Sequence, residues 1–160
     1  MSDTRKTRKT SVDLPGRTVV LHKKARHRFE VIEEFEAGLV LRGTEVKSLR
    51  EGKVSLDEAF GRIDGKEAFL VGCHIPEYFA GNRQNHDPLR RRKLLLRRRE
   101  IKRIETKVTQ KGFTVVPLRL YFSDRGFAKV TLGLCRGKRM GDKREVIKRR
   151  EAERQMRQDL

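Results

Sequence analysis

Apolar and polar residues alternate along several short segments of the chain, which is the pattern of strands with one buried face. Residues 29–35 form the first such segment, with one imperfect alternating face. The pair Ala37-Gly38 can turn or bulge a strand, and residues 39–41 continue the apolar pattern beyond it. The pattern therefore predicts a long strand that bends near Gly38 and ends before Gly43.

Two β-hairpins are predicted further along the chain. Residues 59–63 and 68–71 have strand-like patterns on either side of Asp64-Gly65, a dipeptide that favours the tight turn of a hairpin. The second hairpin has alternating segments at residues 116–122 and 130–134, with a turn at residues 123–126.

Two segments have the spacing of helices. Residues 44–51 place Val46 and Leu49 three apart before Gly52. The better helix is residues 97–111, which has Lys and Arg on its other faces, Gly112 as its C-cap and, if it begins early, Leu94 as an extension. Its apolar face comprises Ile101, Ile104 and Val108.

These segments amount to about six strands, two hairpins and two or three short helices, without the alternation of strand and helix that marks a parallel sheet. This count favours a mainly β protein, a small six-stranded antiparallel OB-like barrel, which leaves one face free for oligonucleotides. A half-open α+β sandwich is the alternative.

Charge adds a prediction about the partner. The chain has 160 residues and a formal net charge of +18, which favours nucleic acid first and an anionic membrane surface second. The charge is uneven: residues 1–28, 90–111 and 136–160 are strongly basic, whereas residues 29–89 carry seven basic and twelve acidic groups. Such a shaped footprint is typical of an RNA-binding surface rather than of a uniform basic coat.

Charge and hydropathy together divide the chain into three parts. Residues 1–16 are expected to form a flexible basic arm, residues 17–135 the RNA-binding barrel, and residues 136–160 a C-terminal tail. The apolar residues of the tail share no face, so the tail has little to bury. A capping pair, Asp142 and Glu145, and two i,i+4 pairs bias it toward helix, but weakly. We expect the tail to be disordered when free and helical when bound to a polyanionic surface.

Other classes are disfavoured. The chain has no apolar run long enough to span a membrane and no secretory signal, so we expect a cytoplasmic location. Cys73 and Cys135 are expected to be reduced core residues. The four histidines lack the spacing of metal ligands, and His86-Asp87-Pro88 is interpreted as a loop whose Asp caps the next few residues. We therefore expect no catalytic residues, metal, cofactor or small-molecule substrate.

Seven sequence blocks, in this order and spacing, resemble the SmpB family, the bacterial SsrA-binding proteins. They are Lys23-Lys-Ala-Arg-His27, Phe35-Glu-Ala-Gly38, Gly43-Thr-Glu-Val-Lys-Ser-Leu-Arg50, Asn85-His-Asp-Pro-Leu-Arg90, Arg92-Lys-Leu-Leu-Leu96, Gly112-Phe-Thr-Val-Val-Pro117 and Gly137-Lys-Arg-Met-Gly-Asp-Lys-Arg144. The resemblance covers roughly residues 17–150. It implies a six-stranded OB-like barrel that binds the tRNA-like domain of transfer-messenger RNA (tmRNA) and delivers it to stalled ribosomes for trans-translation.

The resemblance also implies a monomer without catalytic activity, and it assigns roles to particular positions. The tail would enter the decoding centre, formed by 16S rRNA, and the empty mRNA channel of the ribosome, and it would act there through Asp142, Lys143 and Arg144. The matched RNA-contacting residues are Lys23, Lys24, Arg26, His27, Phe29, Glu36, Leu95, Lys129, Gly137 and Lys138. Phe29 departs from the family, which often has Tyr there, so its weight as a contact is smaller.

The residue types fit these roles to different degrees. Lys and Arg neutralise phosphates, and Arg and His also stack on unpaired bases. A carboxylate such as Glu36 repels phosphate, so it contributes only by accepting hydrogen bonds from base edges or by orienting an Arg. For the basic cluster at residues 23–27 and for Glu36, the plainer interpretation is that they are solvated surface charges. Arginines at positions 90–92 and 97–99 frame Leu94, Leu95 and Leu96, which predicts a core anchor with a basic rim, although one exposed Leu could pack on a base.

Two other functions stay open from the sequence. A constitutive ribosomal protein or rRNA chaperone with an OB-like barrel would have the same composition. A nuclease or RNA-modifying enzyme is the more distant alternative, because no acid and base can be paired from the sequence.

Overall fold

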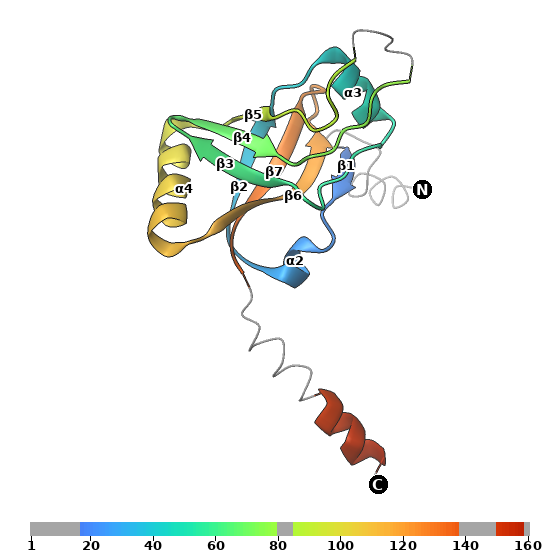
Figure 1. The fold of residues 1–160 in the computed structure, drawn as a ribbon, viewed down its shortest axis with the longest axis vertical. Helices are drawn as coiled ribbons and strands as arrows, with labels where there is room; N and C mark the ends of the chain where they lie inside the picture. The colour runs from blue at the N-terminus through green and yellow to red at the C-terminus, as the bar shows by residue number, and fades with distance from the viewer. Residues whose placement is uncertain (1–16, 80–84, 138–149, 159–160) are drawn as a thin grey trace, which may run out of the picture.

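The computed structural model describes residues 17–79, 85–137 and 150–158 (Figure 1). The strands are β1 (Thr18–Leu21), β2 (Phe29–Leu39), β3 (Phe60–Asp64), β4 (Glu67–Val71), β5 (Arg92–Leu95), β6 (Thr114–Phe122) and β7 (Ala128–Gly137). The helices are α2 (Ala25–Arg28), α3 (Gly43–Arg50) and α4 (Arg98–Lys111). Residues 150–158 are also helical in the absence of a partner, although the tail is expected to be disordered when free. Every side chain in this helix is exposed.

Six strands close into a ring. Neighbours pair in the order β6-β3-β4-β5-β2-β7, and β7 pairs back with β6, all antiparallel. The predicted six-stranded antiparallel barrel is thus confirmed. The short strand β1 was not predicted, and it lies outside the ring, paired with β6 through Leu21 and Arg119.

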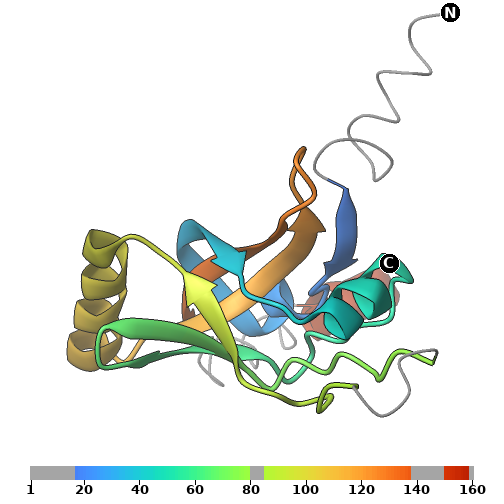
Figure 2. The same cartoon turned by 90° about the horizontal axis from the view of Figure 1, so that it is seen from above.

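The core fills the inside of this ring. Alternate residues of β2, from Phe35 to Leu39, point inward and are buried with residues such as Leu70, Leu120 and Leu132. Helix α4 packs on the barrel through Ile101 and Ile104. Figures 1 and 2 place α4 at one side of the barrel and β1 at the other.

Both hairpins form as predicted. In the first, Asp64 pairs with Glu67, so the two loop residues are Gly65 and Lys66, one position later than the Asp64-Gly65 pair suggested. Gly65 has φ 62°, a left-handed conformation that suits glycine. The second hairpin joins β6 to β7, with Phe122 paired to Ala128.

The predicted helices also form, with one correction. Gly112 ends α4 in the left-handed conformation, as expected. Leu94 does not extend this helix, because it belongs to β5, a strand that was not predicted. The reason lies at Arg97, which is extended (ψ 149°) and has Glu100 as its capping partner, so the helix cannot continue backwards.

The ends of the barrel are also defined. Strand β7 continues through Gly137, so it includes the first two residues of the predicted tail. Cys73 and Cys135 are buried free thiols, as predicted, and burial raises the pKa of each to about 11.

Candidate RNA-binding surface

The basic turn after β1 is a single helical turn, α2, fixed from below by two buried residues. Ala25 packs against Val116, Leu118 and Cys135. The buried His22 ring bonds through Nδ1 to the Pro117 carbonyl oxygen at 2.9 Å. With this base anchored, the side chains predicted to contact RNA are left exposed, namely Lys23, Lys24, Arg26 and His27.

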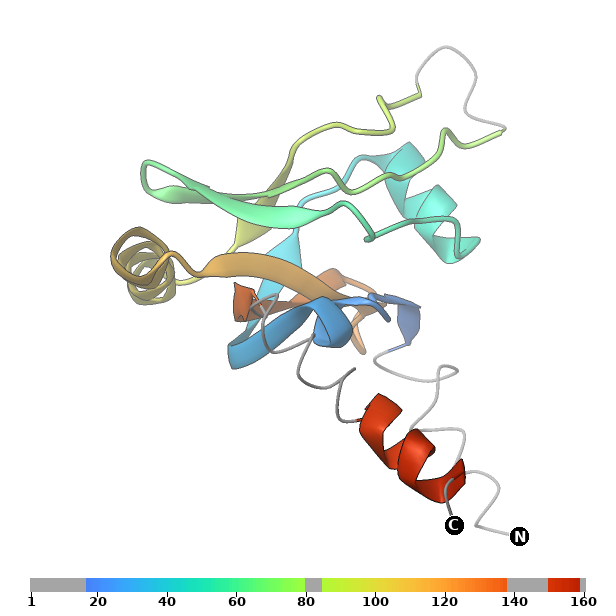
Figure 3. The ribbon, with the colours of Figure 1, turned by 60° about the horizontal axis from the view of Figure 1, so that its bottom comes forward.

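A cleft of about 420 Å³ lies beside this turn (Figure 3 shows α2 next to β1). Arg119 projects there from β6, with its guanidinium 4.3 Å from the Tyr121 ring centre and its Nε donating to Thr18. The cleft is lined by Leu21, His22, Lys23, Arg26, Glu34, Leu118, Arg119 and Thr131. A cation-rich hollow of this size, next to an exposed basic turn, can receive phosphate and part of a nucleotide.

Three more predicted residues meet on the outer face of adjacent strands. Gly38 of β2 is paired with Leu95 of β5 on one side and with Lys129 of β7 on the other. Leu95 is 54% exposed, and Lys129 is half-buried between the inward-facing residues of β7. Glu36 lies two residues before Gly38 and so points to the same side. The barrel therefore brings Glu36, Leu95 and Lys129 together, although they are far apart in the sequence.

The other β2 glutamates are occupied by arginines from three different elements. Glu30 pairs with Arg136, Glu33 with Arg103 and Glu34 with Arg26. Among the described residues, Glu36 alone of this set has no ion-pair or hydrogen-bond partner. An exposed carboxylate without a cation is available to accept hydrogen bonds from base amino or imino groups.

Not every predicted residue lies on this surface. The Phe29 ring is half-buried and packs against the cluster of Ala25, Val116 and Cys135, so it supports the basic turn. Gly137 is the exposed last residue of β7, paired with Phe29. Lys138, Asp142, Lys143 and Arg144 lie outside the described residues.

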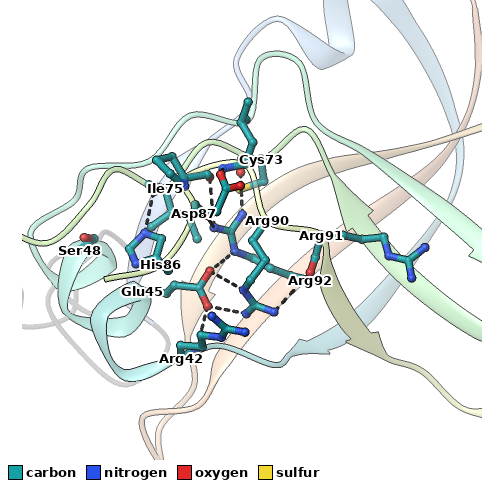
Figure 4. Close-up of polar contacts among 12 residues, drawn as sticks. Arg42, Glu45, Ser48, Cys73, Ile75, His86, Asp87, Arg90, Arg91 and Arg92 are labelled. Carbon is teal, nitrogen blue, oxygen red and sulfur yellow. Dashed lines mark hydrogen bonds and ion pairs between the residues drawn. The ribbon is translucent and has the colours of Figure 1, made fainter. Parts of the chain in front are cut away.

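A buried polar network behind this surface was not predicted from the sequence (Figure 4). Glu45 of α3 is fully buried and accepts hydrogen bonds from Arg92 Nε at 2.5 Å and from Arg90 at 2.6 Å. Arg92 is itself fully buried, and it donates to the Cys73 carbonyl oxygen at 2.7 Å. The interpretation of Arg92 as part of a basic rim was therefore wrong, because its charge is neutralised inside the protein.

This network attaches the loop before β5 to helix α3. Burial by itself would raise the pKa of Glu45, but hydrogen bonds from Arg90, from the Arg42 backbone N–H and from Arg92 outweigh it and hold that pKa below its ordinary value. His86 adds a second attachment, with Nε2 at 2.8 Å from the Ile75 carbonyl oxygen and Nδ1 at 2.9 Å from Thr44 Oγ1. These contacts explain the histidine as structural, and they position β5 and so Leu95.

The three leucines at positions 94–96 divide between core and surface as predicted. Leu94 is buried and Leu96 packs partly on the core, whereas Leu95 is the single exposed one. Asp87 also behaves as predicted: its carboxylate accepts the Leu89 backbone N–H at 2.9 Å and so stabilises the loop.

Across residues 17–79, 85–137 and 150–158, no group of three or more His, Cys, Asp or Glu side chains could hold a metal ion. No helix in this part of the chain is both long and apolar enough to cross a membrane.

Comparison with known proteins adds the family. A family model described as "SmpB protein" matches residues 19–160. The chain is 54% identical to an SsrA-binding protein of Chelativorans sp. (strain BNC1) over 84% of this chain and 86% of that protein. It is 51% identical to an SsrA-binding protein of Levilactobacillus brevis over 93% of this chain and 94% of that protein.

A solved structure shares both fold and sequence. It is described as "tmRNA-SmpB: a journey to the center of the bacterial ribosome", and its protein chain is 48% identical to this one, with a TM-score of 0.65 over 79% of this chain and 86% of that chain. The family match covers far more than half of the residues, and both relatives align over most of their length. The chain therefore belongs to the SmpB family.

Proposed function

We propose that this chain binds the tRNA-like domain of tmRNA and delivers that RNA to stalled ribosomes for trans-translation. The observation that carries the proposal is the meeting of Glu36, Leu95 and Lys129 on one outer face of the barrel. These residues come from three strands, and the family resemblance had assigned each of them to RNA. The relatives named SsrA-binding protein, and the tmRNA-SmpB structure, supply the identity of the RNA.

Each part of the surface has a distinct task in this proposal. The exposed cations of the basic turn, Lys23, Lys24 and Arg26, neutralise phosphates and release counterions, which gives affinity. Glu36 reads a base edge by accepting hydrogen bonds, and Leu95 packs its exposed side chain on a base or sugar. Binding alone performs the function, and no chemical step is assigned to the protein.

The proposal gives the tail a separate role on the ribosome. Asp142, Lys143 and Arg144 would act in the decoding centre, and the rest of the tail, in which residues 150–158 are already helical, would be held as an ordered helix in an mRNA channel that holds no message. Ordering the tail has an entropic cost, so it is favourable only where the channel supplies new contacts. A ribosome with an empty channel is then favoured over a translating one by differential binding.

The experiment is a salt series of binding to three RNAs of equal length: the tRNA-like domain of tmRNA, an ordinary tRNA and an unrelated hairpin. We expect the first to bind at least a hundredfold more tightly at about 150 mM salt, a difference of about 2.7 kcal/mol. Equal affinities with one steep salt slope would mean that counterion release explains all binding. That result would favour a constitutive ribosomal protein or rRNA chaperone.

A further inference from the structure

Helix α4 presents an outward face rich in cations, which also includes the exposed Thr106 and Gln110. Its buried side holds Ile101 and Ile104, and its half-buried Val108 packs on the same core. The opposite side carries the exposed Arg99, Lys102 and Arg103, and it is flanked by Arg98 and the half-buried Lys107. At 1.5 Å per residue, these side chains extend along a helix of about 21 Å.

Along α4 the six cations far outnumber the two glutamates. Of the two glutamates in α4, Glu100 is engaged at the N-terminus, where it accepts the Arg97 backbone N–H at 3.0 Å. Glu105 is exposed at the edge of the face, where it lines a cleft toward the β3–β4 hairpin together with Arg98 and Lys102. Among the described residues, only one outward cation of this helix has a carboxylate partner, the Arg103 that pairs with Glu33.

The arrangement is unfavourable for the isolated protein. Arg98 and Lys102 are like charges at i,i+4, and so are Lys107 and Lys111. Such pairs destabilise a helix. Nevertheless the helix is firmly placed by its buried face, by the Glu100 carboxylate that accepts the Arg97 backbone N–H, and by the left-handed Gly112 at its end. A rigid face on which, among the described residues, Arg103 alone of the cations has a carboxylate partner suits an external polyanion.

The face is better suited to helical RNA than to a single strand. Its outward residues include no aromatic side chain, whereas proteins that bind single strands stack bases on aromatic rings. A double-stranded RNA is recognised by its phosphates and 2′-hydroxyls and by its shape. A straight row of Lys and Arg, with the exposed Gln110 amide beside it, offers those contacts.

We infer that the outward face of α4 is a second RNA-binding surface, which holds the phosphate backbone of a double-helical RNA segment. This surface lies at the side of the barrel away from β1 (Figures 1 and 2). It goes beyond the proposed function, because the chain can then hold one RNA at the basic turn and a helical segment at α4 at the same time.

The test measures binding of the full-length chain to a perfectly paired 20-base-pair RNA duplex over a range of salt concentrations. The variant combines Arg99→Gln, Lys102→Gln and Lys107→Gln, which keep helix propensity. We expect at least a tenfold loss of affinity, and a salt slope smaller by about two to three, roughly one for each phosphate contact removed. The matched control combines Arg50→Gln, Lys53→Gln and Arg125→Gln, three exposed cations elsewhere, and is expected to change affinity less than threefold.

One further variant and a second RNA complete the test. A variant that keeps all three positive charges, with Arg99→Lys, Lys102→Arg and Lys107→Arg, should retain duplex binding. That result would show that the charge of these side chains, and not their packing, is responsible. The Gln variant should bind the tRNA-like domain of tmRNA within threefold of the unmodified chain. Equal losses in the Gln variant and the control would overturn the inference, as would equal losses for both RNAs. Binding to anionic vesicles of phosphatidylglycerol is measured as well, and a loss in the Gln variant that occurs only with these vesicles would also overturn it. Failure of the proposed function is measured separately, as binding of the tRNA-like domain no tighter than that of ordinary tRNA.

Discussion

Leu94 and Leu95 are neighbours in the chain but lie on opposite faces of β5, one 2% exposed and the other 54%. Leu94 pairs with Ala68 and fills the core, whereas Leu95 stands outside beside Gly38. The side-chain alternation of a strand thus gives one leucine to stability and the next to the candidate RNA surface.

This division predicts opposite outcomes for two matched substitutions. Leu95→Ala should weaken binding of the tRNA-like domain about tenfold, about 1.4 kcal/mol, because it removes an apolar contact. Its unfolding free energy should change by less than about 0.5 kcal/mol. Leu94→Ala should lower the unfolding free energy by about 2–5 kcal/mol through loss of burial and a cavity. Urea denaturation and RNA titration measure both; a Leu95→Ala protein with full RNA affinity would remove this residue from the surface.

Glu36 gives a second prediction, since it is the β2 glutamate left without a cation among the described residues. Glu36→Ala should weaken specific RNA binding by about 1–3 kcal/mol, the range for a base-edge contact, without reducing the salt slope. If the carboxylate merely repelled phosphate, its removal would tighten binding instead. Glu67→Ala is the control, because Glu67 is also an exposed strand glutamate, paired with Lys93, and should leave RNA binding unchanged.

The buried Glu45 network predicts a pH-dependent stability. Its folded-state pKa is lowered, so the stabilisation is complete above the ordinary pKa of 4.5 and is lost as the pH falls through the lower folded value. Glu45→Gln should lower the unfolding free energy by about 3 kcal/mol at neutral pH, because Arg92 is left as a buried charge without its partner.

The difference in unfolding free energy between the unmodified chain and Glu45→Gln should therefore become smaller as the pH falls below about 4.5. Urea denaturation at several pH values measures this difference. Glu51→Gln serves as the control on the C-cap of the same helix, where Glu51 forms only an exposed pair with Lys53 at 3.5 Å. That variant should change stability by less than about 0.5 kcal/mol at every pH. A constant Glu45→Gln difference across the whole range would contradict the predicted ionisation.

The end of β7 specifies where the tail can be removed without harm. A chain ending at Gly137 keeps the Glu30–Arg136 pair and the pairing of Phe29 with Gly137. It should bind the tRNA-like domain within about tenfold, about 1.4 kcal/mol, yet abolish peptide tagging on ribosomes stalled in a cell-free translation reaction. Alanine at Asp142, Lys143 and Arg144 together should act like the truncation.

A chain ending at Cys135 is the matched control, because it loses the last two residues of the strand. It should melt at a lower temperature than the chain ending at Gly137. Parallel loss of tagging and of RNA affinity in the Gly137 truncation would show that barrel and tail do not act separately.

Local patterns were sufficient for much of this fold. The two hairpins depend on short turns, and α4 on a periodic apolar face with a glycine cap, so each is specified by neighbouring residues. Strand β5 has only four residues set among arginines, and its strand character comes from pairing with β4 and β2. No local pattern contains that information.

The candidate site shows the same limit. The basic turn could be predicted because its charges are adjacent in the sequence. The family resemblance identified Glu36, Leu95 and Lys129 as RNA contacts, but it did not show that they lie close together. Arg92 was misplaced, because three successive arginines look alike in sequence. Only the fold, which puts Glu45 of α3 opposite this position, determines which one is buried.

The pairing of β2 with β7 also bears on how the chain folds as it is synthesised. Glu30 and Arg136 are 106 positions apart, and β6, which also borders β7, is made only shortly before it. The barrel cannot close until nearly all of its sequence has left the exit tunnel. Because non-local strand pairing is slow, most of β2, with Glu30, waits without its β7 partner during that time. Early cessation of synthesis before β7 would leave an open sheet with no RNA surface, so only completed copies of the barrel are competent to bind.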